Sequence, residues 1–163
     1  MSNPKIKFKI AYVGDMIFEL YPEKAPLTVE NFLSLIKEGF YTNTVFHRVI
    51  KNFVIQGGGY DASGRQKRAH SIKGEFSANG CTTNDIPHTR GVISMARTMD
   101  PNSASSQFFI VHGDAPHLDT QYAAFGKLID GMAVVDRIAT IPTDRFECPK
   151  DNIVIDSIEI LEQ

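Results

Sequence analysis

Several short stretches of this chain alternate apolar and polar residues, which is typical of half-buried strands. The clearest is residues 5–12, where every even-numbered position, through to Tyr12, is apolar or aromatic. A turn at 13–15 follows, and residues 16–21 return as the partner strand of a hairpin. Further strands are predicted over 45–50, 53–56, 91–96, 107–111, 123–128 and 153–161.

Two segments have the period of an amphipathic helix instead. The first has Thr28 as its predicted N-cap, apolar residues at i, i+3, i+4 and i+7 from Val29, and Gly39 just beyond its end. The second begins after Gly131 and stops before Pro142. Many short strands with only two helices indicate an all-β barrel or sandwich with helical plugs, and periodicity alone does not decide between them.

Length and composition favour an ordinary globular domain. The chain has 163 residues, of which 42% are hydrophobic and 22% charged, so we expect residues 1–163 to form a single domain with a full core. The net charge of −2 gives no general attraction to nucleic acid or to an anionic membrane. No apolar run approaches the roughly 18 residues of a membrane span, and the N-terminus lacks an apolar signal segment. We therefore expect a cytoplasmic monomer with no nucleic-acid or membrane partner.

The cysteines and histidines argue against a metal or cofactor site. Cys81 and Cys148 lie far apart, so two free thiols in a reducing compartment are expected, with a disulfide between them as the alternative. The five histidines are scattered without a ligand pair at helical spacing. Residues 57–62 fit the looser dinucleotide fingerprint, but no helix or suitably placed acidic residue follows. We expect neither metal nor cofactor.

Two further chemistries have little support in the sequence. Ser103, Ser105 and Ser106 lie in a turn-rich stretch without a local base, so acyl transfer would need a triad assembled from distant positions, which remains open. A basic patch within residues 65–73 has no interleaved aromatic residues. We interpret it as a solvated loop rather than as an RNA-binding surface.

One stretch places a fixed cation inside an apolar, glycine-rich run. Residues 44–59 contain two short predicted strands joined at 51–52, with Arg48 inside the first strand and three glycines after Gln56. A charge within a strand is costly unless it is paired or faces a cleft. A second stretch, residues 103–111, contains the adjacent aromatic residues Phe108 and Phe109, which must face opposite sides of a strand.

The segments FHRVIKNFVIQGG at 46–58 and SQFFI at 106–110 together resemble the two signature segments of the cyclophilins, a class of peptidyl-prolyl isomerases. The resemblance covers nearly the whole chain, and the SMART segment at 94–98 resembles single-domain bacterial members. It implies a closed eight-stranded antiparallel barrel with an α-helix capping each end. A packed barrel interior has no room for a substrate, so the site is expected on the outer wall.

The resemblance also implies the site residues. Arg48 would donate hydrogen bonds to the prolyl nitrogen as the amide twists, Gln56 would orient Arg48, and Gln107 would hold the substrate backbone. Phe46 and Phe108 should point into the barrel. The other residues that match the family's peptide groove are Phe53, Val54, Ala96, Arg97, Phe109, His117, Leu118 and Tyr122.

Four of these positions differ from the best-known members of the family. Val54 replaces a methionine, Tyr122 a histidine and Arg97 an asparagine. His117 stands where cyclosporin-sensitive members have tryptophan, and this chain has no tryptophan. We therefore predict weak cyclosporin binding with isomerase activity retained.

The leading hypothesis is an isomerase that acts, without a cofactor, on X–Pro bonds in unfolded or flexible protein segments and so assists folding. The first alternative is a non-catalytic module that binds proline-containing peptides. The second is a general chaperone whose isomerase activity is incidental. A protein selected only for binding could keep the apolar slot without the cation, so the presence of Arg48 favours the enzyme.

Overall fold

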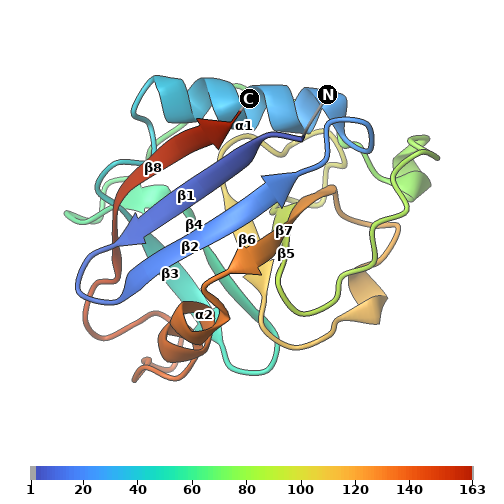
Figure 1. Ribbon diagram of the computed structural model, residues 1–163. Coiled ribbons are helices and arrows are strands. Elements are labelled where there is room, and N and C mark those ends of the chain that lie inside the picture. The colour runs from blue at the N-terminus through green and yellow to red at the C-terminus, as the bar shows by residue number, and fades with distance from the viewer. Residues whose placement is uncertain (1–2, 163) are drawn as a thin grey trace.

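The computed structural model describes residues 3–162, whose strands close into a barrel in the order β1-β2-β7-β5-β6-β4-β3-β8 (Figure 1). Every neighbouring pair is antiparallel. This confirms the eight-stranded barrel and excludes the sandwich. The strands are β1 (Lys5–Ile10), β2 (Gly14–Leu20), β3 (Thr44–Ile50), β4 (Val54–Asp61), β5 (Val92–Met95), β6 (Phe108–Val111), β7 (Ala124–Asp130) and β8 (Val154–Glu162).

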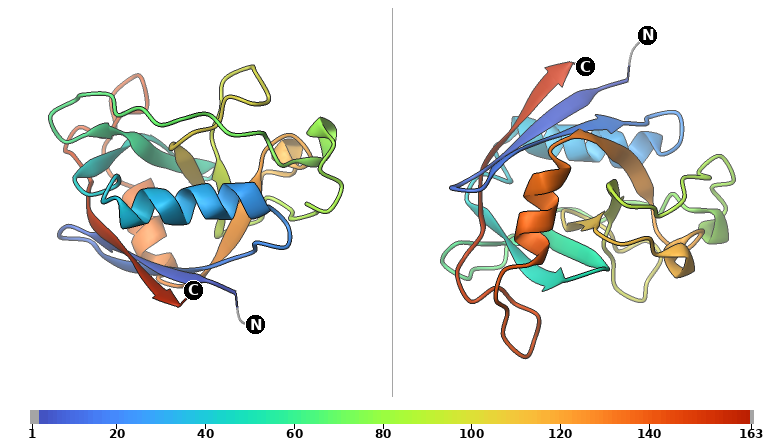
Figure 2. Two further views of the ribbon diagram at one scale, coloured as in Figure 1. Left: turned by 90° about the horizontal axis from the view of Figure 1, so that it is seen from above. Right: turned by 60° about the horizontal axis from the view of Figure 1, so that its bottom comes forward.

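Two α-helices cover the two open ends of the barrel, as predicted. Helix α1 (Pro26–Lys37) lies across the top of the barrel in Figure 1, and α2 (Met132–Ala139) lies at the bottom. The view from above in Figure 2 shows α1 crossing the opening. Two short 3₁₀ helices, η1 (Ser77–Asn79) and η2 (Pro116–Leu118), lie in the long connections. Among the residues described, no helix has the length and apolarity to cross a membrane.

The barrel interior is filled by aromatic side chains. Phe108 lies at the centre, with ring centroids 5.4 Å from Phe8, 5.8 Å from Phe32, 5.7 Å from Tyr41 and 5.9 Å from Phe46. All five side chains are essentially inaccessible to solvent. Phe46 and Phe108 therefore point inward as predicted, and a substrate has to bind outside the barrel.

The neighbouring residue, Phe109, belongs to a second apolar cluster on the outer wall of the barrel. Successive side chains of β6 face opposite sides, so Phe108 enters the core while Phe109 packs outside it. The buried members of this outer cluster are Val54, Val92, Phe109, Val111, Ala115, Leu118 and Ala124.

The end of β1 and the beginning of α1 differ from their predicted positions. Strand β1 ends at Ile10, and Tyr12 is fully exposed in the hairpin turn with φ of +64°. Helix α1 begins at Pro26, two residues before its predicted cap. Thr28 lies inside its first turn, and both the backbone N–H and the hydroxyl of Thr28 donate to Oε1 of Glu75, at 2.6 and 2.7 Å. A buried carboxylate from the long loop thus accepts hydrogen bonds from the N-terminal turn of α1. No local sequence pattern predicts this contact.

The long connection between β4 and β5 is held by local bridges rather than by a regular element. Tyr60 pairs with Gln66, and Ile72 pairs with Ala104 of the loop before β6. Asn84 donates to the carbonyl oxygens of Glu75 and Ala124, at 2.7 and 2.9 Å. Cys81 and Cys148 are both free thiols.

Candidate active site

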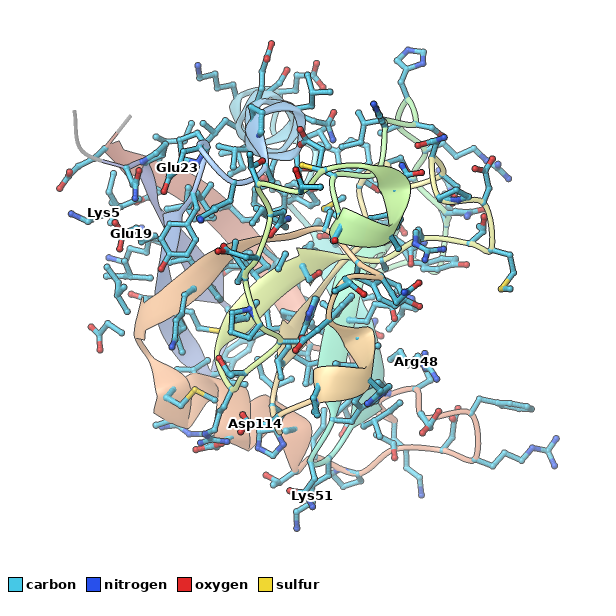
Figure 3. The ribbon with its side chains drawn as sticks, turned by 90° about the vertical axis from the view of Figure 1, so that its right-hand side faces the viewer. Lys5, Glu19, Glu23, Arg48, Lys51 and Asp114 are labelled. Atoms are coloured by element: carbon cyan, nitrogen blue, oxygen red, sulfur yellow. The ribbon has the colours of Figure 1, made fainter. Side chains whose placement is uncertain are left out.

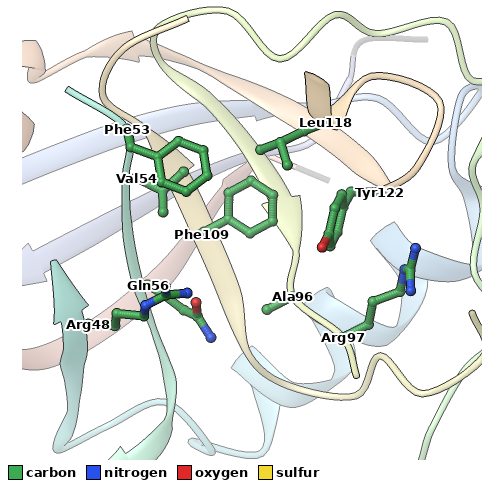
Figure 4. A pocket seen from close by; sticks show the side chains of 9 residues that line it. All are labelled: Arg48, Phe53, Val54, Gln56, Ala96, Arg97, Phe109, Leu118 and Tyr122. Atoms are coloured by element: carbon green, nitrogen blue, oxygen red, sulfur yellow. The ribbon is translucent and has the colours of Figure 1, made fainter. Parts of the chain in front are cut away.

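A cavity of about 160 Å³ opens on the outer wall beside β3, β4 and β6. Figure 4 shows Arg48 and Gln56 at one edge of it and the rings of Phe53, Phe109 and Tyr122 around the rest. The lining residues are Arg48, Phe53, Val54, Gln56, Ala96, Arg97, Phe109, Leu118 and Tyr122. All nine are among the residues predicted from the sequence.

The β3–β4 hairpin brings the cation and the first aromatic ring to the same cavity. Arg48 of β3 pairs in register with Gln56 of β4, and the turn between the strands comprises residues 51–53. Phe53 therefore lies in the turn and not in the strand where it was predicted. Asn52 adopts φ of +66°, and its backbone N–H donates to Nδ1 of His112 at 2.8 Å. The backbone N–H of His112 donates to the carbonyl oxygen of Phe53, also at 2.8 Å, which fixes the turn against the end of β6.

The apolar part of the cavity includes the ring of Phe109, which packs between two other rings. Phe109 is 4% exposed, and the ring of Tyr122 meets it edge to face with 5.7 Å between centroids. Behind it, the imidazole of His88 stacks on the Phe109 ring with 5.9 Å between centroids and 23° between planes. The rings of His88 and Tyr122 leave the buried Phe109 little rotational freedom, so this apolar surface exists before a ligand arrives.

The same histidine completes a Ser-His-Asp chain, which is the distant triad that the sequence left open. Nε2 of His88 lies 2.9 Å from Oγ of Ser94, and Nδ1 lies 3.0 Å from Oδ1 of Asp119. Ser94 is fully buried, so its hydroxyl cannot reach a substrate. Burial lowers the pKa of His88 and outweighs the opposing effect of Asp119, so the imidazole is neutral near pH 7. We conclude that these three hydrogen-bonded side chains support Phe109, and that Ser94 does not act as a nucleophile.

Two predicted residues lie beside the lining of the cavity without being part of it. Gln107 accepts a hydrogen bond at Oε1 from Nε2 of Gln56, at 3.0 Å. His117 stacks on Phe53 with 5.4 Å between ring centroids and 24° between planes. Each therefore contacts a lining residue without being one itself.

Arg97, which replaces an asparagine of the best-known family members, interacts mainly with other groups of the protein. Its guanidinium lies over the rings of Phe76 and Tyr122, at 4.9 and 4.8 Å from their centroids. Nη2 and Nε also donate to the carbonyl oxygen of Gln121, at 2.8 and 3.2 Å. Arg97 thus packs against the ring of Tyr122 and uses most of its N–H donors in hydrogen bonds within the protein.

The hydrogen bonds around Arg48 also differ from the expected arrangement. Gln56 was predicted to orient Arg48, but within residues 3–162 no hydrogen bond joins the two side chains, and Nε2 of Gln56 donates to Gln107. Nη2 of Arg48 lies 3.5 Å from Oε1 of Glu147, in the loop after α2. Sequence reasoning missed both Glu147 and His88, because neither belongs to a signature segment.

The electrostatics at this edge keep the neighbouring histidine neutral. Burial lowers the pKa of His47 to about 4, and the positive charge of Arg48 adds to the effect. Arg48 is consequently the fixed cation of the cavity edge. Within residues 3–162, no group of three or more histidine, cysteine or acidic side chains is placed to hold a metal ion.

Comparison with known proteins agrees with the fold. Residues 5–160 match the family described as cyclophilin type peptidyl-prolyl cis-trans isomerase. A peptidyl-prolyl cis-trans isomerase of Acinetobacter baylyi is 43% identical over 98% of this chain and 87% of its own. Peptidyl-prolyl cis-trans isomerase B of Escherichia coli is 40% identical over 91% of this chain and 95% of its own.

Solved structures show the same relationship. The crystal structure of a cyclophilin type peptidyl-prolyl cis-trans isomerase from Cryptosporidium parvum superimposes with a TM-score of 0.83 at 34% identity and covers 99% of both chains. A second structure, determined in the presence of the dipeptide Ala-Pro, gives 0.82, also at 34% identity, and covers 98% of this chain and 99% of that one. This chain belongs to the cyclophilin-type peptidyl-prolyl cis-trans isomerases and is an isomerase of X–Pro peptide bonds.

Proposed function

We propose that the protein accelerates rotation about X–Pro bonds by placing the guanidinium of Arg48 against the prolyl nitrogen of the half-rotated amide. The uncatalysed rotation has a barrier of about 20 kcal/mol. Twisting the amide removes its resonance and leaves a basic lone pair on nitrogen. A donor aimed at that lone pair stabilises the twisted state far more than the planar one, and no covalent bond to the enzyme is needed.

The observation that carries this proposal is that Arg48 and Phe109 line one cavity. The apolar seat of Phe53, Val54, Phe109 and Leu118 suits a proline ring, and the cation at its edge suits the ring nitrogen. The Arg48 side chain is 47% exposed in the free protein. A bound peptide would displace water from it and strengthen each hydrogen bond that it donates.

The proposed substrates are proline-containing segments of unfolded or flexible proteins. A relative of the same fold was crystallised in the presence of Ala-Pro, which supports a proline dipeptide as the minimal ligand. Ala96 and the backbone of Arg97 would hold the peptide alongside the cavity like an added strand, with Gln56 and Gln107 providing polar contacts. We further propose a single cytoplasmic domain that works as a monomer, in line with the two free thiols.

Cyclosporin is proposed to bind weakly. His117 stacks on Phe53 beside the seat, where cyclosporin-sensitive members of the family have tryptophan. An imidazole covers less apolar area than an indole and has a different donor geometry. We expect the lower affinity for the large macrocycle to leave the binding of a proline ring unchanged.

The experiment that tests the proposal is exchange spectroscopy on a short Ala-Pro peptide with the parent and with Arg48→Ala. Loss of the donor should lower kcat/KM about a hundredfold, equivalent to about 3 kcal/mol. Arg48→Lys keeps the charge but not the rigid array of donors, and should recover only part of the activity.

The alternatives predict different outcomes of the same experiment. A binding module would bind the peptide without speeding its exchange. If the protein is a chaperone with incidental isomerase activity, the Arg48→Ala variant should suppress aggregation of an unfolded client as well as the parent does. Full activity of Arg48→Ala would exclude the proposed mechanism.

A further inference from the structure

Within residues 3–162, the side chain of Arg48 has one ion-pair partner, Glu147, which lies 99 residues away in the chain. The distance from Nη2 to Oε1 is 3.5 Å, and the two side chains are 47% and 44% exposed. Figure 3 shows Arg48 on the side of the molecule, beside the loop that follows α2. The ion pair therefore joins this loop to the edge of the candidate active site.

The backbone of Glu147 is held in a conformation that disfavours glutamate. Its φ is +67°, in the left-handed region where a side chain is strained and glycine is not. The carbonyl oxygen of Glu147 accepts from the backbone N–H of Val49 at 2.8 Å, and its N–H donates to the carbonyl oxygen of Asp144 at 3.0 Å. The loop is thus fixed to β3 at the residue that follows Arg48.

The carboxylate of Asp144 makes the loop rigid from within. Its Oδ1 accepts from the backbone N–H groups of Phe146 and Cys148, at 2.8 and 3.1 Å, on either side of Glu147. The backbone of Glu147 is therefore set by the loop and by β3 and not by Arg48. Its carboxylate extends from this fixed backbone position to the Arg48 side chain.

We propose that Glu147 is a positioning residue for Arg48, an inference that rests on the role proposed for Arg48 above. Arginine has five N–H donors in a planar array, and Glu147 engages the Nη2 group. With that group held, rotation of the guanidinium is restricted and its other donors face the cavity. Within residues 3–162 the side-chain partner of Arg48 is Glu147 and not Gln56, so Glu147 performs the orienting function that the resemblance assigned to Gln56.

Stability of the fold does not explain the arrangement. Ion pairs between half-exposed side chains contribute little to folding, and a positive φ at glutamate opposes folding. Glycine at 147 would relieve the backbone while removing the carboxylate. The two effects of Glu147→Gly therefore separate a positioning role from a structural one.

The test compares Glu147→Gly and Glu147→Gln with the parent in exchange spectroscopy on an Ala-Pro peptide. We expect kcat to fall about three- to tenfold in both variants, with the peptide Kd changed less than twofold. The midpoint of urea unfolding should stay the same or rise for Glu147→Gly. The matched control is Glu159→Gln, which removes a comparably exposed pair with Lys9 on the far side of the barrel and should leave kcat unchanged.

Two further measurements make the test decisive. In an Arg48→Ala background, Glu147→Gly should have no additional effect on kcat, because the two residues act through one interaction. The NMR signal of the Arg48 Nε–H group should show greater mobility in Glu147→Gly than in the parent. Unchanged or higher kcat in Glu147→Gly, with Arg48→Ala strongly impaired, overturns this inference alone. Full activity of Arg48→Ala overturns the proposed function and this inference with it.

Discussion

Gln56 donates a hydrogen bond from Nε2 to Oε1 of Gln107, at 3.0 Å. The bond joins β4, which contains Gln56, to the residue that immediately precedes β6. Gln107 occupies this position because Gly59 has no side chain. A Cβ at residue 59 would lie 2.4 Å from Nε2 of Gln107 and 2.5 Å from its Cδ. The glycine that follows the signature segment thus leaves room for a polar contact of the site.

Gly59→Ala should therefore impair the site more than the fold. The new methyl group must displace the flexible Gln107 side chain, which breaks its hydrogen bond with Gln56. We expect kcat/KM to fall several-fold while the free energy of unfolding changes by less than about 1 kcal/mol. Peptide exchange and urea unfolding measure the two effects.

The control is the preceding glycine. Gly58 has φ of +86°, and a Cβ there would lie 2.8 Å from both the Phe108 ring and the carbonyl oxygen of Ser106. Gly58→Ala should accordingly cost about 2 kcal/mol or more of stability. Normal kcat/KM in Gly59→Ala would show that Gln107 is not part of the site.

Stability should decrease as the pH falls below about 6.5, because one buried and one partly buried histidine resist protonation in the folded protein. Burial lowers the pKa of His47 to about 4, and burial also lowers that of His88. Below pH 6.5 the unfolded chain binds protons that the folded protein does not. The stabilisation is therefore complete above the unfolded pKa and is lost on acidification, for His47 down to about pH 4.

The loss should amount to at most about 1.4 kcal/mol per pH unit for each histidine, and to less for the partly exposed His47. Urea unfolding at pH 7, 6 and 5 measures it. His47→Gln should flatten the dependence, and Arg48→Ala should raise the pKa of His47 because a nearby positive charge is removed. Stability that rises on acidification across this range would contradict the prediction.

His117→Trp should strengthen cyclosporin binding at least tenfold. An indole would extend the stacked surface on Phe53 and add a directed N–H donor. Titration calorimetry measures the affinity, and kcat/KM on an Ala-Pro peptide should stay near that of the parent.

His117→Phe serves as the matched variant, since it adds apolar area without the donor and should gain less affinity. Nanomolar binding of cyclosporin by the parent would refute the role assigned to His117.

The sequence by itself determined the parts of this protein that depend on short-range pattern. A strand over 107–111 requires Phe108 and Phe109 to face opposite sides, and the resemblance assigned Phe108 to the interior, where the structure places it. The helical period from Val29 predicted α1, and the two signature segments contain five of the nine residues that line the cavity, namely Arg48, Phe53, Val54, Gln56 and Phe109. These features are local, so the residues that specify them are adjacent in the chain.

The tertiary structure alone decided the partners of those residues. Barrel closure brings Gln107 to Gln56, the long loop brings Glu75 to the N-terminus of α1, and the loop after α2 brings Glu147 to Arg48. Each pair is separated by 47 to 99 residues. A hydrogen bond or ion pair forms only between atoms that are close in space. The pattern of neighbouring residues in the sequence does not show which distant residues the fold brings together.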